Sequence, residues 1–258
     1  MMLIEKTLDG SPIHYWTNDT TANRCILFLH PAFGDHTCFD EQVACFSERY
    51  KVITVDLIGH GNSLGNGSMS DMSGFIRMIL DAENIQKINL VGVSLGAVLA
   101  QDFANKYPQH LSALCCIGGY DINHFDASLQ HGNSKEQMKM MLKAMVSIKR
   151  FAEDNKRISA YTEHAQAAFY QINLRFKKRS FRHLASLGSM INRQETPRRD
   201  YPLFIGVGEH DSPMAIQASA SWHAHEPDSR FVIFKNAGHL VNMDVPEDFH
   251  RELESLLN

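Results

Sequence analysis

A serine flanked by glycines stands out in the sequence, in the segment Gly92-Val93-Ser94-Leu95-Gly96. A strand-like apolar run precedes this segment and a helix-like run follows it, which is the context that a G-x-S-x-G nucleophile turn requires. The flanking glycines allow a sharp turn, and amides at the N-terminus of the following helix would face a developing anion. The pattern predicts that Ser94 is a nucleophile rather than an incidental serine in a glycine-rich turn.

A serine hydroxyl needs a general base, and the base needs a carboxylate to orient it. Of the 14 histidines, His239 is favoured because it lies between small residues just after the last predicted strand. Asp211, which follows the penultimate predicted strand, is the preferred acid. Asp121 is its rival because it also follows a strand end, and Glu209 is a third option.

An acyl-transfer site also needs N–H donors for the oxyanion of the tetrahedral intermediate. The residue after the nucleophile, Leu95, should supply one backbone N–H. The second should come from the loop after the predicted strand 25–30. In this loop Ala32 is the expected donor and Phe33 the alternative.

The elements that must position these residues can be read from apolar runs. Six short runs are continuous rather than alternating, which is typical of strands buried on both faces. They are residues 25–30, 50–57, 88–93, 111–117, 203–207 and 230–234. Helical patterns occur at residues 39–48, 73–84, 95–106, 213–224 and 246–257. A hairpin around Asp9-Gly10 should join residues 2–7 and 12–17. The alternation predicts an α/β fold with a mostly parallel sheet and helices on both faces.

Residues 121–196 interrupt this alternation with a helical stretch rich in Met, Ala, Lys, Gln and Arg. The stretch contains 13 Lys and Arg against 7 Asp and Glu, whereas the rest of the chain has 12 against 22. We therefore expect a core domain formed by residues 1–120 and 197–258, with 121–196 inserted as a helical cap over the site. The alternative is a solvated basic helical surface. The methionines in this stretch could line an apolar pocket or form cap core; they are Met138, Met140, Met141 and Met145.

Composition excludes several other functional classes. The formal net charge of −4 gives no reason to expect nucleic-acid binding. No apolar stretch is long enough to span a membrane and the N-terminus lacks a secretory pattern, so we expect a cytoplasmic protein. The five cysteines include no CxxC pair. No His, Asp or Glu spacing suggests a metal site and no nucleotide fingerprint occurs, so neither a metal nor a cofactor is expected.

Five motifs, taken in order and context, resemble the α/β-hydrolase fold superfamily in its small capped branch of esterases, lactonases and carbon–carbon bond hydrolases. The resemblance covers residues 24–119 and 201–257, through LFLHPAFGD, VDLIGHGNS, LVGVSLGAVLAQDFANKYP, GVGEHD and NAGHLVNMDVPEDF. It implies an eight-stranded sheet whose first strands are antiparallel, with the cap inserted after the sixth. The chain order Ser94, Asp211, His239 is that of the family's triad, which favours Asp211 over Glu209.

The resemblance also implies the oxyanion roles given to Leu95 and Ala32. Pro31 departs from the pattern, because many relatives have glycine there. Ser94 argues against the branches of the fold that use an aspartate nucleophile. The resulting expectation is a serine hydrolase of a small, partly apolar carboxylic ester or lactone. The alternatives are a carbon–carbon bond hydrolase or lyase acting on an anionic dicarbonyl substrate, and a ligand receptor without turnover. The sequence leaves the oligomeric state open, a homodimer included.

Overall fold

An eight-stranded sheet forms the centre of the structure, a computed structural model that describes residues 3–124, 146–184 and 199–258. The strands are β1 (Ile4–Thr7), β2 (His14–Thr17), β3 (Cys25–Leu29), β4 (Lys51–Val55), β5 (Ile88–Val93), β6 (Leu111–Ile117), β7 (Leu203–Gly208) and β8 (Arg230–Phe234). Their order across the sheet is β1-β2-β4-β3-β5-β6-β7-β8. The β1–β2 and β2–β4 pairs are antiparallel and the others are parallel. This is the predicted α/β-hydrolase fold, including its N-terminal hairpin.

Helices cover both faces of the sheet, and further helices lie beyond one of its edges. They are α1 (Asp40–Phe46), α2 (Met72–Ala82), α3 (Leu95–Lys106), α5 (Ile148–Ser159), α6 (Glu163–Arg175), α7 (Phe181–Leu184), α8 (Pro213–His225), α9 (Val241–Asp244) and α10 (Pro246–Leu257). Short 3-10 turns lie at His36–Phe39, Met69–Asp71, Pro108–His110 and Lys178–Ser180. Strands β3 to β7 are largely buried between these layers, as their sequence predicted. For residues 230–234 the prediction was wrong, because β8 is an edge strand and its Ile233 is 48% exposed.

Two apolar cores lie on the two sides of the sheet. One contains buried residues of α2, α3 and α8, including Phe103 and Trp222. The other contains residues of α1 and α10, including Phe46 and Phe249. Cys25 of β3 and Cys115 and Cys116 of β6 are buried in these layers, and all five cysteines are free. Among the described helices, none combines the length and apolar character needed to cross a bilayer.

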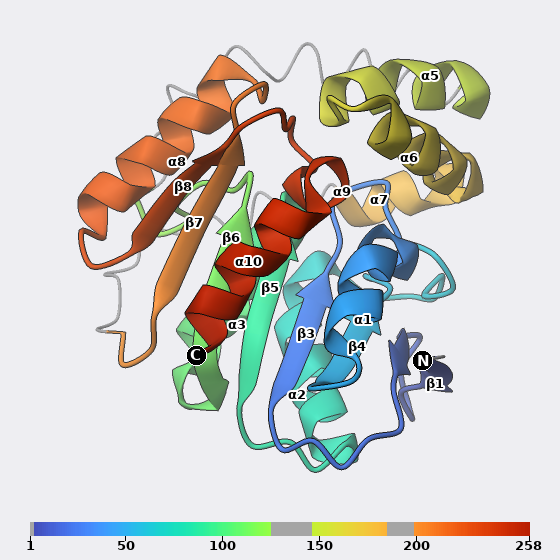
Figure 1. The fold of residues 1–258 in the computed structure, drawn as a ribbon. Helices are drawn as coiled ribbons and strands as arrows, with labels where there is room; N and C mark the ends of the chain where they lie inside the picture. Colours follow the sequence, from blue (N-terminus) through green and yellow to red (C-terminus); the bar gives the residue numbers. More distant parts are fainter. Residues whose placement is uncertain (1–2, 125–145, 185–198) are drawn as a thin grey trace.

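The carboxyl ends of the parallel strands meet at one edge of the sheet. Leu29 lies opposite Gly92, and Val93 lies opposite Ile117, so β3, β5 and β6 end together. Figure 1 shows α5 and α6 beyond this edge, on the side towards which the strand arrows point. These helices belong to the stretch expected as a cap, whereas residues 125–145, including all four of its named methionines, and 185–198 lie outside the described residues.

Strand β4 is shorter than its apolar run predicted, because it ends at Val55 rather than at residue 57. The cause lies in the next side chain, the buried carboxylate of Asp56. It accepts the backbone N–H of His36 at 2.8 Å and that of Asn62 at 2.7 Å, which turns the chain out of the sheet. Apolar character alone therefore overestimates the strand where a buried acid organises the following loop.

Candidate active site

Ser94 lies at the sharp turn between β5 and α3. Its backbone has φ 55° and ψ −113°, in the region of positive φ that non-glycine residues rarely adopt. The Ser94 N–H donates to the carbonyl of Ile117, the last residue of β6, at 2.7 Å. The strained conformation is thus held by a hydrogen bond to the neighbouring strand, and such strain is common at functional sites.

The two glycines of the motif are required by close backbone contacts. A Cβ on Gly92 would lie 2.3 Å from the carbonyl oxygen of Gly96, and a Cβ on Gly96 would lie 2.0 Å from that of Leu29. Any side chain at either position would therefore force β3, β5 and α3 apart. The G-x-S-x-G pattern is explained by this packing, which presents Ser94 at the carboxyl edge of the sheet.

His239 and Asp211, which lie 28 residues apart in the sequence, are paired directly. The Nδ1–H of His239 donates to Oδ2 of Asp211 at 2.7 Å, and the Asp211 side chain is buried. Two backbone bonds join the loops that carry them, from Glu209 N–H to the Phe234 carbonyl and from His210 N–H to the Ala237 carbonyl, both at 2.8 Å. The loops after β7 and β8 therefore position the pair as one unit.

The imidazole of His239 also lies against the end of β6. A Cβ on Gly118 would approach its Cε1 and Nδ1 atoms to 2.9 Å, and Gly118 has φ 60°. Because Ser94 is bonded to Ile117, the adjacent residue, the serine and the histidine both lie at the end of this strand. The structure thus brings the three candidates for nucleophile, base and acid to one edge of the sheet.

The charge state of His239 is set by two opposing effects. Burial lowers the pKa of the imidazole, but the charge of the Asp211 carboxylate and its hydrogen bond outweigh burial. The net effect raises the pKa of His239 above its ordinary value. The pair is therefore arranged to stabilise an imidazolium, which is what a base must become when it takes a proton from serine.

The rival acids have other partners. Oδ2 of Asp121 lies 2.9 Å from Nδ1 of His124 and 4.0 Å from Nδ1 of His225. Glu209 is largely exposed and accepts the backbone N–H of Asn236 at 3.3 Å. Of the three carboxylates that the sequence suggested, Asp211 is the one that is bonded to His239.

The predicted oxyanion loop follows β3. Pro31, the departure from the usual pattern, accepts the Nδ1–H of His30 and the N–H of Gly34 through its carbonyl, at 2.7 and 3.1 Å. The proline therefore forms part of an ordered turn around Ala32 and Phe33. At the other side of the site, Leu95 is the first residue of α3, where the N–H groups have no intrahelical acceptor.

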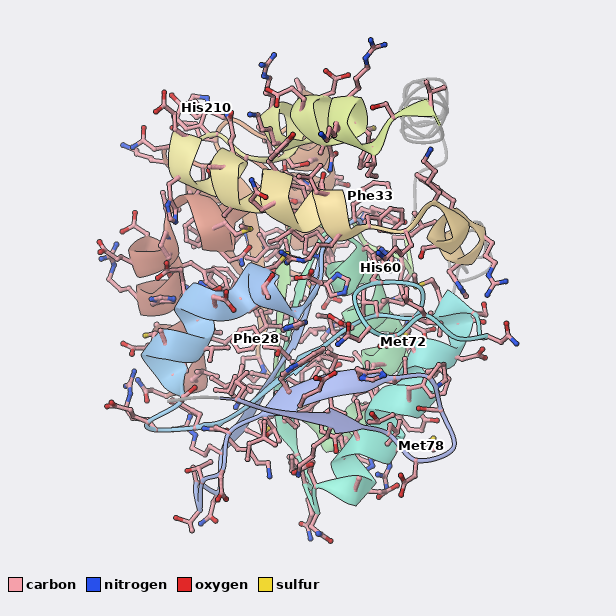
Figure 2. The ribbon with its side chains drawn as sticks, turned by 90° about the vertical axis from the view of Figure 1, so that its right-hand side faces the viewer. Phe28, Phe33, His60, Met72, Met78 and His210 are labelled. Carbon is pink, nitrogen blue, oxygen red and sulfur yellow. The ribbon has the colours of Figure 1, made fainter. Side chains whose placement is uncertain are left out.

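Phe33 has φ 64° and its ring packs among three aromatic rings. The ring centroids lie 4.8 Å from Phe151, 5.1 Å from Phe176 and 5.9 Å from Phe181. Phe176 also lies 5.2 Å from the buried ring of His60. Figure 2 shows Phe33 above His60, between the sheet and the helices beyond its carboxyl edge. His60 bonds to the Ile58 carbonyl in its own loop and so helps to hold that loop in place.

Three residues that the sequence did not single out join the helices of residues 146–184 to the site loops. Arg175 donates to Oδ2 of Asp35 at 2.7 and 2.9 Å, and the Nδ2 of Asn173 donates to the Phe33 carbonyl at 3.2 Å. Asp244 accepts backbone N–H groups from both Gly238 and Tyr161. An arginine at a helix end and an acid two residues before a proline are common surface patterns, so the sequence carried no signal for these contacts.

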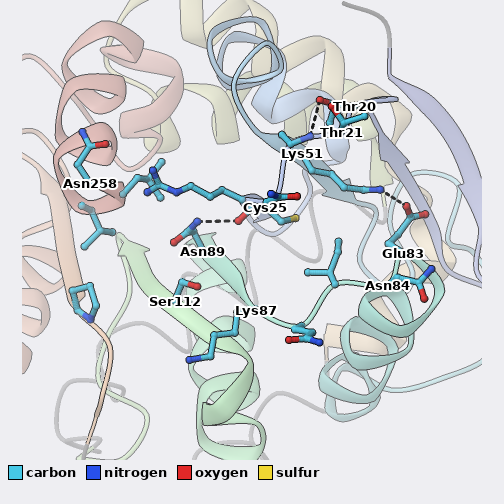
Figure 3. Close-up of a pocket in the computed structure, with 18 residues that line it drawn as sticks. Thr20, Thr21, Cys25, Lys51, Glu83, Asn84, Lys87, Asn89, Ser112 and Asn258 are labelled. Atoms are coloured by element: carbon cyan, nitrogen blue, oxygen red, sulfur yellow. Dashed lines mark hydrogen bonds and ion pairs between the residues drawn. The ribbon is translucent and has the colours of Figure 1, made fainter.

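A cavity of about 760 Å³ lies at the opposite edge of the sheet (Figure 3). Its lining includes Cys25 and Lys51 at the amino ends of β3 and β4, and Asn89, which donates to the Cys25 carbonyl at 3.0 Å. Lys51 forms an ion pair with Glu83 at 2.6 Å. Because the cavity lies at the amino ends of the strands, it is separate from the loops that carry Ser94 and His239.

Comparison with known proteins identifies the family of this chain. Residues 26–252 match the alpha/beta hydrolase family. The chain belongs to that family. Membership of this family accounts for the fold and confirms the prediction that the protein is a hydrolase. It does not specify which bond the protein cleaves.

The names of similar proteins indicate different activities. The chain is 23% identical to the dihydrolipoyllysine-residue acetyltransferase component of the acetoin cleaving system of Cupriavidus necator, over 97% of this chain and 67% of that protein. It is 25% identical to the putative carbamate hydrolase RutD of Escherichia coli O44:H18, over 81% and 80% of the two chains. A thermophilic esterase from Thermogutta terrifontis has a similar structure, with a TM-score of 0.79 and 21% identity, covering 100% of this chain and 98% of that one.

Proposed function

We propose that this hydrolase cleaves a small carboxylic ester or lactone through an acyl-enzyme on Ser94. The observation that carries the proposal is the 2.7 Å bond between His239 and Asp211, in a pair whose imidazole lies against the strand end to which Ser94 is bonded. A nucleophile on a strained turn, a base and an orienting acid are the three groups that serine acyl transfer needs.

In the proposed reaction, Oγ of Ser94 attacks the substrate carbonyl while Nε2 of His239 takes the serine proton. Asp211 keeps the proton of His239 on Nδ1 and stabilises the imidazolium. The backbone N–H groups of Leu95 and Ala32, with Phe33 as the alternative to Ala32, would hold the oxyanion. His239 then protonates the leaving group, and water activated by the same imidazole releases the acid. No cofactor takes part in these steps.

The helices of residues 146–184 support the proposal of a cap, inserted as residues 121–196 into a core of residues 1–120 and 197–258. They contribute Phe151, Phe176 and Phe181 around Phe33, next to the proposed oxyanion loop. An aromatic environment at this point favours a substrate with an apolar acyl or alcohol group.

An anionic dicarbonyl substrate, as for a carbon–carbon bond hydrolase, would need uncompensated cations near the serine. Arg175, which lies next to the proposed oxyanion loop, is neutralised by the buried carboxylate of Asp35 at 2.7 Å. This pair offers no net positive charge to an anionic substrate group at that point, which favours the ester or lactone over the dicarbonyl acid.

The test is a panel of acyl esters of graded length, lactones, carbamates and anionic diketone acids, assayed with wild type and Ser94→Ala. Ser112→Ala is the matched control, because Ser112 is an exposed serine on β6. We expect neutral esters or lactones to be turned over fastest. The Ser94→Ala variant should lose at least about 10³-fold in kcat/KM together with covalent labelling by a fluorophosphonate.

Each other outcome has a distinct meaning. Full activity of Ser94→Ala would refute the nucleophile, and faster cleavage of diketone acids would refute the ester assignment. Fluorophosphonate labelling of wild type without turnover of any compound in the panel would instead indicate a receptor built on the same fold.

A further inference from the structure

A second group of chemically capable side chains lies at the edge of the molecule where the chain leaves β6. Asp121, His124 and His225 each direct one ligand atom to a common point, and these atoms all lie within 4.8 Å of one another. Asp121 and His124 follow β6, whereas His225 is the last residue of α8. The group is separate from the proposed active site, in which Asp211 is the acid that is bonded to His239.

The distances resemble those of a metal site. Nδ1 of His124 lies 2.9 Å and Nδ1 of His225 lies 4.0 Å from Oδ2 of Asp121. Zinc holds imidazole nitrogens and carboxylate oxygens at about 2.0–2.2 Å, so neighbouring ligands of a tetrahedral ion lie roughly 3.3–3.6 Å apart. The two measured distances fall on either side of that value. Small rotations of two exposed imidazoles would therefore be enough to close the site around an ion.

The carboxylate is held in place by the core. Its other oxygen, Oδ1, accepts the backbone N–H of Asn123 at 2.9 Å. Asn123 in turn accepts a bond from Nδ2 of Asn105 at 2.7 Å, and the Ile122 N–H donates to Oε1 of Gln101 at 3.1 Å. Asn105 and Gln101 both belong to α3. Asp121 is thus a buried ligand oriented by hydrogen bonds of its own, as metal-binding carboxylates usually are.

We propose that Asp121, His124 and His225 form a binding site for a divalent transition metal ion, with Zn²⁺ as the expected occupant. Two imidazoles and one carboxylate form a donor set suited to Zn²⁺, and the remaining coordination positions would be filled by water. Binding of Zn²⁺ at Nδ1 of His124 replaces the hydrogen bond to Asp121, and the neutral imidazole then carries its single proton on Nε2.

The location gives the site a structural consequence. His124 is the last described residue before the expected cap continues, and His225 ends a helix of the core. An ion shared by Asp121, His124 and His225 would join the start of the cap to α8. It would do so a few residues from Gly118, which contacts the imidazole of His239.

The experiment is titration of the tag-free, metal-stripped full chain with Zn²⁺, monitored by calorimetry, and with Co²⁺, monitored by its visible d–d absorption. We compare wild type with His124→Gln and His225→Gln. His164→Gln serves as the matched control, because His164 is exposed on α6 outside the group. We expect one tight Zn²⁺ per chain in wild type and in the control. Each ligand variant should bind more than about tenfold more weakly and lose the Co²⁺ bands.

At the same Zn²⁺ concentration, the melting temperature should rise more in wild type and in the control than in either ligand variant. Unchanged Zn²⁺ affinity in both ligand variants would overturn the proposal, because the ion would then be bound by other histidines. Failure of wild type to bind Zn²⁺ would also overturn it and leave an ordinary Asp–His hydrogen bond. Both ligand variants replace exposed side chains, so equal melting temperatures without metal check that they fold. The proposed esterase activity does not enter any of these measurements.

Discussion

Replacing Asp244 with alanine should damage both stability and activity, because one buried carboxylate joins the expected cap to the loop of the proposed base. Its Oδ1 accepts the N–H and hydroxyl of Thr162 at 2.7 and 2.8 Å, and the N–H of Tyr161 lies 3.0 Å from both oxygens. Its Oδ2 accepts the N–H of Gly238, next to His239, at 2.8 Å. The adjoining Leu240 N–H donates to the carbonyl of Ser159 at 2.9 Å.

The size of the effect follows from what the substitution leaves unpaired. The buried Gly238 N–H would lose its acceptor, which costs about 1–3 kcal/mol. The N–H groups of Tyr161 and Thr162 are less buried and can bond to water, so each adds roughly 1 kcal/mol. We expect Asp244→Ala to lower the free energy of unfolding by about 3–5 kcal/mol in total. For a chain of this size that corresponds to a fall in melting temperature of roughly 6–20 °C.

Activity should fall as well, because Gly238 positions the backbone of His239. A displacement of the imidazole by about 1 Å would lower kcat/KM by roughly 10²-fold. Calorimetric melting and ester hydrolysis below the melting transition measure the two effects separately. Asp248→Ala is the control, since Asp248 is an exposed acid on α10 whose partner Arg251 is also exposed. Such a surface pair contributes at most about 1 kcal/mol. If Asp244→Ala behaved like this control in both assays, the proposed joint between cap and base would be refuted.

Two further substitutions test the electrostatics of the site. Asp211→Asn should lower kcat by about 10³–10⁴-fold without unfolding the protein. Since His239 must be neutral to act as a base, wild-type kcat/KM should fall as the pH drops through its raised pKa. In Asp211→Asn the burial that lowers the pKa of His239 remains, but the charge that raises it is lost. The acidic limb of the residual kcat/KM profile should therefore move to lower pH. An acidic limb at the wild-type pH would contradict this. Arg175→Gln should cost about 1–2 kcal/mol in denaturant unfolding by leaving the buried Asp35 carboxylate unpaired, since Arg175 itself is half exposed. The double variant with Asp35→Asn should recover part of that loss, and strict additivity would show that the pair is not coupled.

The sequence predicted those parts of the structure in which a short local pattern of residues is compatible with only one backbone arrangement. Gly92 and Gly96 flank Ser94 because backbone atoms approach within 2.3 Å of where a side chain would begin, so the motif itself encodes the turn. Continuous apolar runs encoded the parallel strands for a similar reason, since both faces of the sheet are covered. The choice of acid was harder, because Asp121 and Asp211 both follow strand ends and only the packing shows which one meets His239.

The contacts that could not be predicted are tertiary contacts between segments that lie far apart in the sequence. Arg175 reaches Asp35 across 140 residues, and His225 approaches Asp121 across 104. No spacing rule covers such distances, because each contact depends on how α6 or α8 packs against the loops at the carboxyl edge of the sheet. Asp244 shows the same limit. Its position two residues before Pro246 marks a helix start, whereas its contacts with the Tyr161 and Gly238 backbones arise only from packing. In this hydrolase the motif thus specifies the turn that carries Ser94, while loop and helix packing determines which groups surround that serine.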